Sequence, residues 1–177
     1  MILLPIFSAL LCALSLPNEI FLTGFWPTGF VALIPLYIAL RRASSPRQAA
    51  LIGAIFGSLH HALTSYWLFF YKDFAFWTLG ATTLAYAIVY AVAAMYCNFL
   101  LRTEFRAYRP FLFAIGWVTF EYLKSIGFLG YPWGLLPYSL SSVPLLLQTA
   151  DTTGVYGISF LLALSSSIGA ELLTREE

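Results

Sequence analysis

Long apolar stretches, separated by short groups of charged residues, dominate the chain. The long stretches without a charged side chain after residue 18 include residues 20–40, 48–71, 74–101 and 152–170. They contain between 19 and 28 residues each. A helix needs about 20 mostly apolar residues to cross roughly 30 Å of hydrocarbon. The pattern therefore predicts several membrane-spanning helices.

Residues 1–18 form one more uncharged stretch, whose apolar part is slightly short for a membrane span. A signal peptide is the alternative interpretation of this stretch. However, no basic residue precedes its apolar part, and Pro17-Asn18-Glu19 makes a poor cleavage site because small residues are required there. We therefore expect a first helix that is not cleaved.

Residues 110–128 indicate a further helix, and this one contains two charged side chains, Glu121 and Lys124. Five glycines and prolines follow within residues 127–137. No regular helix continues through that density of helix breakers. An irregular segment is therefore expected after this helix.

Between residues 141 and 149 the sequence predicts a short helix at the membrane surface. Ser141 and Pro144 are typical of a helix start, and the helix is expected to end before Gly154. The predicted fold class is an all-α polytopic membrane protein with about six transmembrane helices and a re-entrant or interfacial segment before the last. We expect one transmembrane domain over residues 1–177, with spans at approximately residues 2–17, 20–40, 49–71, 74–101, 110–128 and 154–173.

The arginines all fall on one side of this predicted bundle. They lie between the second and third helices, between the fourth and fifth, and after the sixth: Arg41, Arg42, Arg47, Arg102, Arg106, Arg109 and Arg175. The opposite loops contain Glu19, Lys72, Asp73 and Asp151. Because cytoplasmic loops are enriched in basic residues, the arginine side is expected to be cytoplasmic. An even number of spans then places both termini in the cytoplasm.

Composition agrees with a membrane protein. Hydrophobic residues make up 60% of the chain and charged residues only 10%, whereas about a quarter of the residues in soluble domains are charged. An ordinary soluble enzyme is therefore excluded. The net charge of +1 also argues against a nucleic-acid partner, because electrostatic binding of nucleic acid requires a concentrated basic face.

Four residues with reactive or ligating side chains lie within the apolar segments. Cys12 and Cys97 are expected to be small buried side chains without a disulfide, because they fall toward opposite ends of their helices. His60 and His61 are adjacent, so they point about 100° apart and do not chelate one metal ion together. We expect one of them to form a hydrogen bond inside the bundle and the other to line a polar pocket, with a proton relay as the alternative. No metal site, cofactor or catalytic residue is predicted.

Glu121 and Lys124 are the most informative charged residues. Glu121 lies eleven residues after Pro110, which corresponds to a depth of about 16 Å along a helix. An ionisable group at such a depth is costly and indicates a functional site by default. Lys124 follows at the i+3 position, where it can pair with Glu121. The two alternatives are an ion pair that only fixes helix packing and a polar feature beneath a substrate cavity.

The irregular segment over residues 130–139 is expected to lie close to membrane depth. Non-helical backbone is tolerated there only when it is buried in protein or lines a cavity. This segment is thus either a rigid re-entrant connection or a wall of a lipid-facing site, and the two interpretations are compatible. Its candidate lipid-cavity residues, beside Glu121 and Lys124, are Tyr131, Pro132, Trp133, Tyr138 and Ser139.

At these residues the sequence resembles the bacterial apolipoprotein N-acyltransferases. Beyond Glu121 and the candidates of the irregular segment, the ordered pattern continues into the last helix through Pro144, Gln148, Ala150, Gly154, Tyr156, Gly157, Ser159 and Phe160. The chain departs from the family's usual residues at Lys124, where the family often has Arg, at Tyr131, where it often has Phe, and at Leu140, where a Gln is common. The resemblance covers essentially the whole chain, and the pattern over residues 121–160 is its most specific part.

The resemblance implies a place in lipoprotein maturation in the bacterial inner membrane. The family transfers an acyl chain from a phospholipid to the N-terminal amine of a diacylglyceryl-cysteine lipoprotein. It has eight membrane helices and a periplasmic nitrilase-like domain, which carries a Glu base, a Lys oxyanion stabiliser and a Cys nucleophile. None of these three roles is transferred to this chain, because no stretch of it is expected to form that soluble domain.

The chain is accordingly expected to be the membrane part of such an enzyme, truncated and not catalytic alone. Its expected partners are membrane phospholipid, the apolipoprotein substrate and, where it is encoded separately, a catalytic half. Two alternatives come from other classes: a small transporter or channel that uses Glu121, Lys124 and the histidines, and a structural membrane assembly protein. A transporter would favour inverted repeats, and no internal duplication is visible in the sequence.

Overall fold

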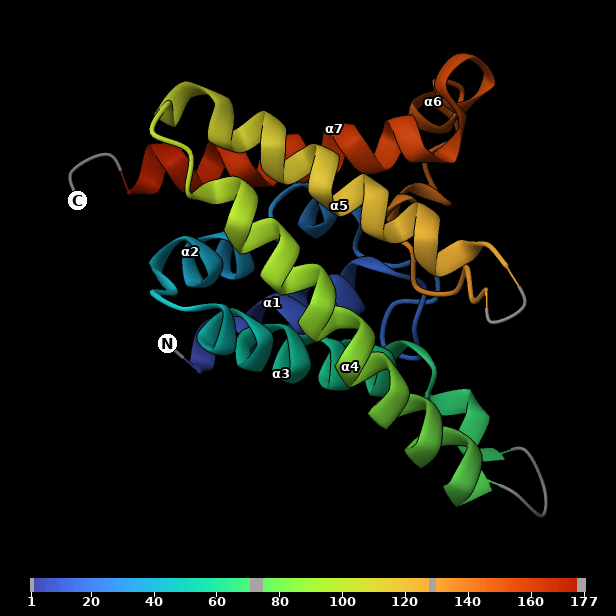
Figure 1. The fold of residues 1–177 in the computed structure, drawn as a ribbon. Helices are drawn as coiled ribbons and strands as arrows, with labels where there is room; N and C mark the ends of the chain where they lie inside the picture. Colours follow the sequence, from blue (N-terminus) through green and yellow to red (C-terminus); the bar gives the residue numbers. More distant parts are fainter. Residues whose placement is uncertain (1, 71–74, 128–129, 175–177) are drawn as a thin grey trace.

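The computed structural model describes residues 2–70, 75–127 and 130–174, and every regular element in these ranges is helical. Figure 1 shows α5 beside α7 along one edge of the molecule and α3 beside α4 along another, in agreement with the closest pairwise packing. The seven α-helices of the described residues are α1 (Leu3–Ser15), α2 (Ile34–Arg42), α3 (Pro46–Thr64), α4 (Ala75–Leu101), α5 (Arg109–Ser125), α6 (Pro144–Leu147) and α7 (Ala150–Leu173). The short 3₁₀ helices are Trp26–Phe30, Tyr66–Phe70, Arg106–Tyr108 and Leu136–Leu140.

The predicted all-α class is confirmed, since the described residues contain no β-strand. Two helices are long and apolar enough to cross a membrane, over Phe76–Leu101 and Ala150–Leu173. The predicted spans at residues 74–101 and 154–173 correspond to these two helices. The short helix expected after Ser141 is also present, as α6.

The continuous helix predicted over residues 20–40 is wrong. A folded-back loop, the 3₁₀ helix Trp26–Phe30 and the nine-residue helix α2 occupy this stretch instead. Gly24 adopts a φ of 71°, and the backbone N–H of Phe25 donates to the carbonyl of Leu14 at 2.9 Å. The loop therefore closes onto the end of α1, where helix carbonyls would otherwise lack partners. Prolines at positions 27 and 35 each begin a new short helix, because proline suits a first helical turn.

Three other helices are shorter than the predicted spans. The spans expected at residues 2–17, 49–71 and 110–128 appear as α1, α3 and α5, with 13, 19 and 17 residues. The predicted ends at residues 71, 74 and 128, the loop residues Lys72 and Asp73, and Arg175 lie outside the described residues.

Glycines allow α3 and α4 to pack closely. A Cβ atom added at Gly53 would lie 2.9 Å from the carbonyl carbon of Tyr90, and one added at Gly57 would overlap the Tyr90 side chain. Such small residues let helix backbones approach each other in a membrane. Gly53 and Gly57 on α3 therefore allow a close helix contact, and its partner surface on α4 is centred on Tyr90.

An aromatic core fills the space between these helices and α5. The ring of Phe56 on α3 lies 5.4 Å from the ring of Tyr90 on α4 and 5.9 Å from the ring of Trp117 on α5. Tyr90 and Phe120 approach to 4.6 Å. Tilted and edge-on pairs of this kind contribute beyond their buried area. The core thus fixes the relative positions of α3, α4 and α5, which together carry the candidate site.

The described arginines lie at or beside the C-terminal ends of α2 and α4 and the N-terminal ends of α3 and α5. These helix ends gather at the end of the bundle where α1 begins and α7 ends (Figure 1). Arg41 pairs with Glu171 at 3.5 Å, and Tyr37 donates to the same carboxylate at 2.5 Å. On the neighbouring helix, Arg102 donates to the carbonyl of Ser44 at 3.1 Å. These contacts join arginine-bearing segments that are far apart in the sequence. The predicted placement of the arginines on one side of the bundle needs such proximity.

The last helix contains one residue with non-helical backbone. Gly154 has a φ of 68° and a ψ of 177° within α7, a conformation that is essentially restricted to glycine. The helix is therefore kinked after its first turn, which carries Asp151. On the C-terminal side of the kink, α7 packs against α5 along its length (Figure 1).

Candidate functional site

Glu121 attaches the irregular segment to two helices. Its carboxylate is 2% exposed and accepts a hydrogen bond from the backbone N–H of Leu136 at 2.8 Å. The hydroxyl of Ser159 on α7 donates to the other carboxylate oxygen. One side chain on α5 thereby holds both the 3₁₀ helix Leu136–Leu140 and α7. Buried carboxylates persist only with such partners, since an unpaired one is costly.

Lys124 binds the same segment at a different point. Its ammonium group donates to the carbonyl oxygen of Trp133 at 2.7 Å and lies 5.8 Å from the ring centroids of Tyr86 and Tyr90. The ion pair given as one alternative for Glu121 and Lys124 is absent as a direct contact, because within the described part of the chain no carboxylate oxygen lies within ion-pair distance of Lys124, although the two charges still attract each other. Each side chain instead satisfies a buried backbone group of the irregular segment, and such groups require partners.

Tyr131 completes the attachment of the segment to the helices. Its backbone N–H donates to the carbonyl of Lys124 at 2.8 Å, and its hydroxyl donates to Ser65 at 3.0 Å. Burial raises the pKa of Tyr131 above its usual range and so further favours the protonated hydroxyl. Its ring lies 5.6 Å from the rings of His61 and Tyr86. The segment is therefore anchored on α3, α4 and α5.

Both histidines form hydrogen bonds inside the bundle, whereas one of them was expected to line a polar pocket. His60 contacts the hydroxyl of Tyr90 at 3.1 Å, and His61 contacts Thr82 at 3.0 Å. Both are 3% exposed. Cys12 and Cys97 are free thiols in the core, and the described residues contain no group of three side chains suited to a metal ion.

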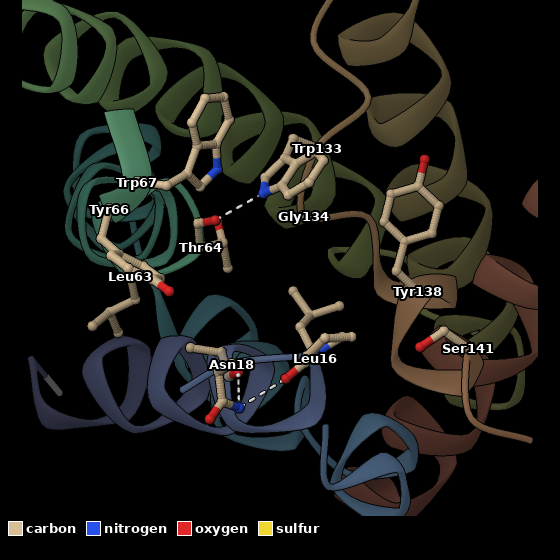
Figure 2. Close-up of a pocket in the computed structure, with 12 residues that line it drawn as sticks. Leu16, Asn18, Leu63, Thr64, Tyr66, Trp67, Trp133, Gly134, Tyr138 and Ser141 are labelled. Atoms are coloured by element: carbon tan, nitrogen blue, oxygen red, sulfur yellow. Dashed lines mark hydrogen bonds between the residues drawn. The ribbon is translucent and has the colours of Figure 1, made fainter. Parts of the chain in front are cut away.

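A cavity of about 330 Å³ opens beside this segment, at the end of the bundle opposite the arginines. In Figure 2, Trp67 and Trp133 lie on one side of it, Leu16 and Asn18 on another, and Tyr138 and Ser141 on a third. The two indole rings meet edge to face at 5.5 Å, and the ring nitrogen of Trp133 donates to the carbonyl of Thr64 at 2.8 Å. Apolar walls with a few polar groups are typical of a site for an apolar ligand.

The structure separates the seven candidate residues into groups. Trp133 and Tyr138 line the cavity. Glu121, Lys124 and Tyr131 do not line it, and they instead bind the segment that carries its wall. The remaining two also lie away from the cavity: Ser139 is fully buried beside Gly29 and donates to the carbonyl of Leu136, and Pro132 is exposed on the segment.

Sequence analysis had identified only part of this cavity. It did not name Trp67, Asn18 or Thr64 as residues of a cavity. Asn18 is fully engaged by backbone: its amide donates to the carbonyl of Leu16 at 2.8 Å, and its oxygen accepts from the N–H groups of Ile20 and Phe21. An asparagine directly after a proline that ends a helix was the available signal for this turn.

Comparison with known proteins identifies the family. Residues 8–168 match the model of the family described as the apolipoprotein N-acyltransferase N-terminal domain. The chain belongs to this family. The matched residues of this N-terminal domain include all seven candidates and every residue that lines the cavity.

Individual relatives carry the same name. The apolipoprotein N-acyltransferase 2 proteins of Treponema denticola and Treponema pallidum are each 40% identical over 169 residues, which is 94% of this chain and 31% and 30% of theirs. The apolipoprotein N-acyltransferase of Borreliella burgdorferi is 31% identical over 170 residues, or 96% of this chain and 32% of that protein. The chain thus spans about a third of the length of the curated relatives that it matches.

Replacing Trp133 of this N-terminal domain with phenylalanine is expected to lower the free energy of unfolding by about 1 kcal/mol, because the hydrogen bond to Thr64 is lost while an aromatic ring stays in the wall. The matched control is Trp67→Phe, which makes the same change to the other indole of the pair. Thermal unfolding in detergent measures both variants. Equal effects of the two substitutions would mean that the Trp133 hydrogen bond contributes nothing.

Proposed function

We propose that these 177 residues form the membrane part of an apolipoprotein N-acyltransferase in the bacterial inner membrane. The complete reaction would move an acyl chain from a phospholipid to the N-terminal amine of a diacylglyceryl-cysteine lipoprotein. The match of residues 8–168 to the N-terminal domain family is the observation that carries this proposal. The described residues are helical throughout their regular elements, so the nitrilase-like chemistry would come from a part outside them, on the same polypeptide or on another.

The proposed orientation has six crossings with the arginine end in the cytoplasm. Basic residues are retained on the cytoplasmic side of membrane proteins, and the described arginines do gather at one end. The helices α4 and α7 are long enough to cross alone. The segments containing α1, α2, α3 and α5 would cross with the help of their adjoining loops and 3₁₀ helices, which are packed against neighbouring helices and therefore tolerated at membrane depth.

In this orientation the cavity beside Trp133 opens at the outer membrane surface. Its apolar and aromatic walls suit an acyl chain, and the hydrogen-bonded segment behind it keeps those walls in place. We propose that this part holds the phospholipid and the lipid chains of the apolipoprotein while the catalytic part acts on them. Glu121 is engaged by the N–H of Leu136 and the hydroxyl of Ser159, which favours this role over a transport path that would need the carboxylate free.

A chimera tests the proposal. The chain is joined to the part of the Treponema denticola relative that follows the matched region, and it is produced in a bacterium depleted of its own apolipoprotein N-acyltransferase. We expect the N-terminal peptide of an abundant lipoprotein to gain the mass of one acyl chain. Neither the 177 residues alone nor the remainder of the relative alone is expected to produce that gain.

Producing the two parts as separate chains tests whether the catalytic part can be supplied by another polypeptide. Lipoproteins that stay diacylated, although the chimera is inserted in the membrane and folded, would overturn the proposed function.

A further inference from the structure

A second hollow lies on the membrane-facing side of the bundle, between α4 and α5. This groove has a volume of about 670 Å³ and is distinct from the cavity beside Trp133. Its walls are apolar side chains from both helices, among them Val89, Val92 and Ala93 on α4 and Phe120 and Leu123 on α5. Such a surface suits a hydrocarbon chain.

One end of the groove carries a positive charge. Lys124 lines this end beside Tyr86, and its side chain is nine-tenths buried. The carboxylate of Glu121 is hydrogen-bonded to Leu136 and Ser159 and forms no direct ion pair with Lys124, although the two charges still attract each other at longer range. The direct contacts of this buried cation are thus a carbonyl oxygen and two aromatic rings, which leaves room for an anionic ligand.

The length of the groove matches one leaflet. Its α4 wall extends from Tyr86 to Tyr96, eleven residues and therefore about 15 Å, which is half of the roughly 30 Å of hydrocarbon in a bilayer. Lys124 lies fifteen residues beyond Arg109 on α5, about 22 Å from the arginine end. The charged end of the groove is therefore in the outer half of the membrane, about 8 Å below its surface, and the apolar part extends past the middle of the membrane.

We propose that the α4–α5 groove binds one acyl chain of an outer-leaflet phospholipid and that Lys124 contacts the phosphodiester of the same lipid. This assignment rests on the proposed function only for the orientation of the bundle in the membrane. A single cation at one end of an apolar groove complements a phospholipid, in which an anionic headgroup is attached to acyl chains. A neutral lipid would bring no anion to Lys124.

Photo-cross-linking in membranes tests the occupant directly. A photoreactive phenylalanine derivative replaces Val89 in the groove wall, and the matched control places it at Leu84, which is more exposed on α4 (68% against 41%) but does not line the groove. After purification and digestion, mass spectrometry is expected to find phospholipid attached mainly to the peptide with the Val89 replacement. Equal phospholipid attachment at the two positions, or none at Val89, would overturn the proposal.

Lipid competition in detergent tests the role of Lys124. The chain is mixed with phosphatidylglycerol and with a diacylglycerol of the same acyl chains, and native mass spectrometry counts the bound lipids. The unaltered chain is expected to prefer the phospholipid by about tenfold, as one charge-assisted contact implies. Lys124→Met should abolish that preference and Lys124→Arg should keep it, while Ala93→Trp should reduce binding of both lipids by filling the groove.

A Lys124→Met variant that retains the phospholipid preference would overturn the headgroup contact. If that variant does not fold, Ala93→Trp and the cross-link at Val89 decide the assignment. The acyl-transfer assay remains separate: absence of transfer by the chimera together with a phospholipid cross-link at Val89 would reject the proposed function and leave the groove assignment standing.

Discussion

Gly53→Leu is expected to prevent α3 and α4 from packing, and to lower the free energy of unfolding by about 3 kcal/mol or more, the upper range for overpacking. A side chain at this position would overlap the backbone carbonyl of Tyr90 and the methyl group of Ala94. Neither group can move without shifting α4 itself. Because Tyr90 also joins the aromatic core, the displacement would extend to Phe56 and Phe120.

Gly80→Leu is the matched control, since a Cβ atom at Gly80 on α4 would meet no atom within 4 Å. This control is expected to be neutral or slightly stabilising, because leucine favours a helix more than glycine does by up to about 1 kcal/mol. Thermal unfolding and the yield of monodisperse protein in detergent measure both variants. A Gly53→Leu protein with the unfolding temperature of the unaltered chain would contradict the close packing of α3 and α4.

Removing the carboxylate of Glu121 is expected to have the second largest effect. Glu121→Ala leaves the buried N–H of Leu136 and the hydroxyl of Ser159 without an acceptor, so we expect a loss of about 3 kcal/mol. Glu121→Gln should cost less, about 1 kcal/mol, because an amide oxygen can still accept from Leu136 and an amide N–H can donate to Ser159.

Two measurements distinguish this role from a general loss of charge. Glu104→Ala removes an exposed carboxylate and is expected to change stability by less than about 0.5 kcal/mol. Limited proteolysis should cut the segment around Leu136 faster in Glu121→Ala than in Glu104→Ala, since that segment loses its attachment to α5. Equal stability and equal cleavage in the two variants would refute the attachment by Glu121.

Sequence analysis found the helices whose apolar stretches also lack helix breakers. The predicted span at residues 74–101 and the helix α4 nearly coincide, because nothing in that stretch interrupts a helix. The stretch at residues 20–40 carries no charge either, yet it contains Gly24 and several prolines and glycines. The absence of charges shows that a stretch is compatible with hydrocarbon, but it does not show that the stretch forms one continuous helix. Residues 20–40 are uncharged, yet their glycines and prolines interrupt the helix.

The sequence predicted which residues belong to the candidate site, but it predicted only some of the contacts that they make. The spacing of Glu121 and Lys124 put them on one face of a helix, which is correct. However, an i+3 spacing cannot show which hydrogen-bonding groups another segment of the chain brings to these side chains. Leu136 and Trp133 supply buried backbone groups that need partners, and these displaced the expected ion pair. Contacts across 9 and 15 residues of irregular chain depend on the path of that chain, which the sequence pattern does not specify.

The kink at Gly154 leaves a continuous part of α7 whose length equals the thickness of the hydrocarbon layer of a membrane. From Gly154 to Leu173 the helix has 20 residues, and 20 residues of helix measure about 30 Å, the thickness of the hydrocarbon layer. The turn before Gly154 carries Asp151, whose charge would be costly in hydrocarbon. In the proposed orientation one glycine therefore marks the water boundary, and the helix changes direction at the depth where its surroundings change from lipid to water.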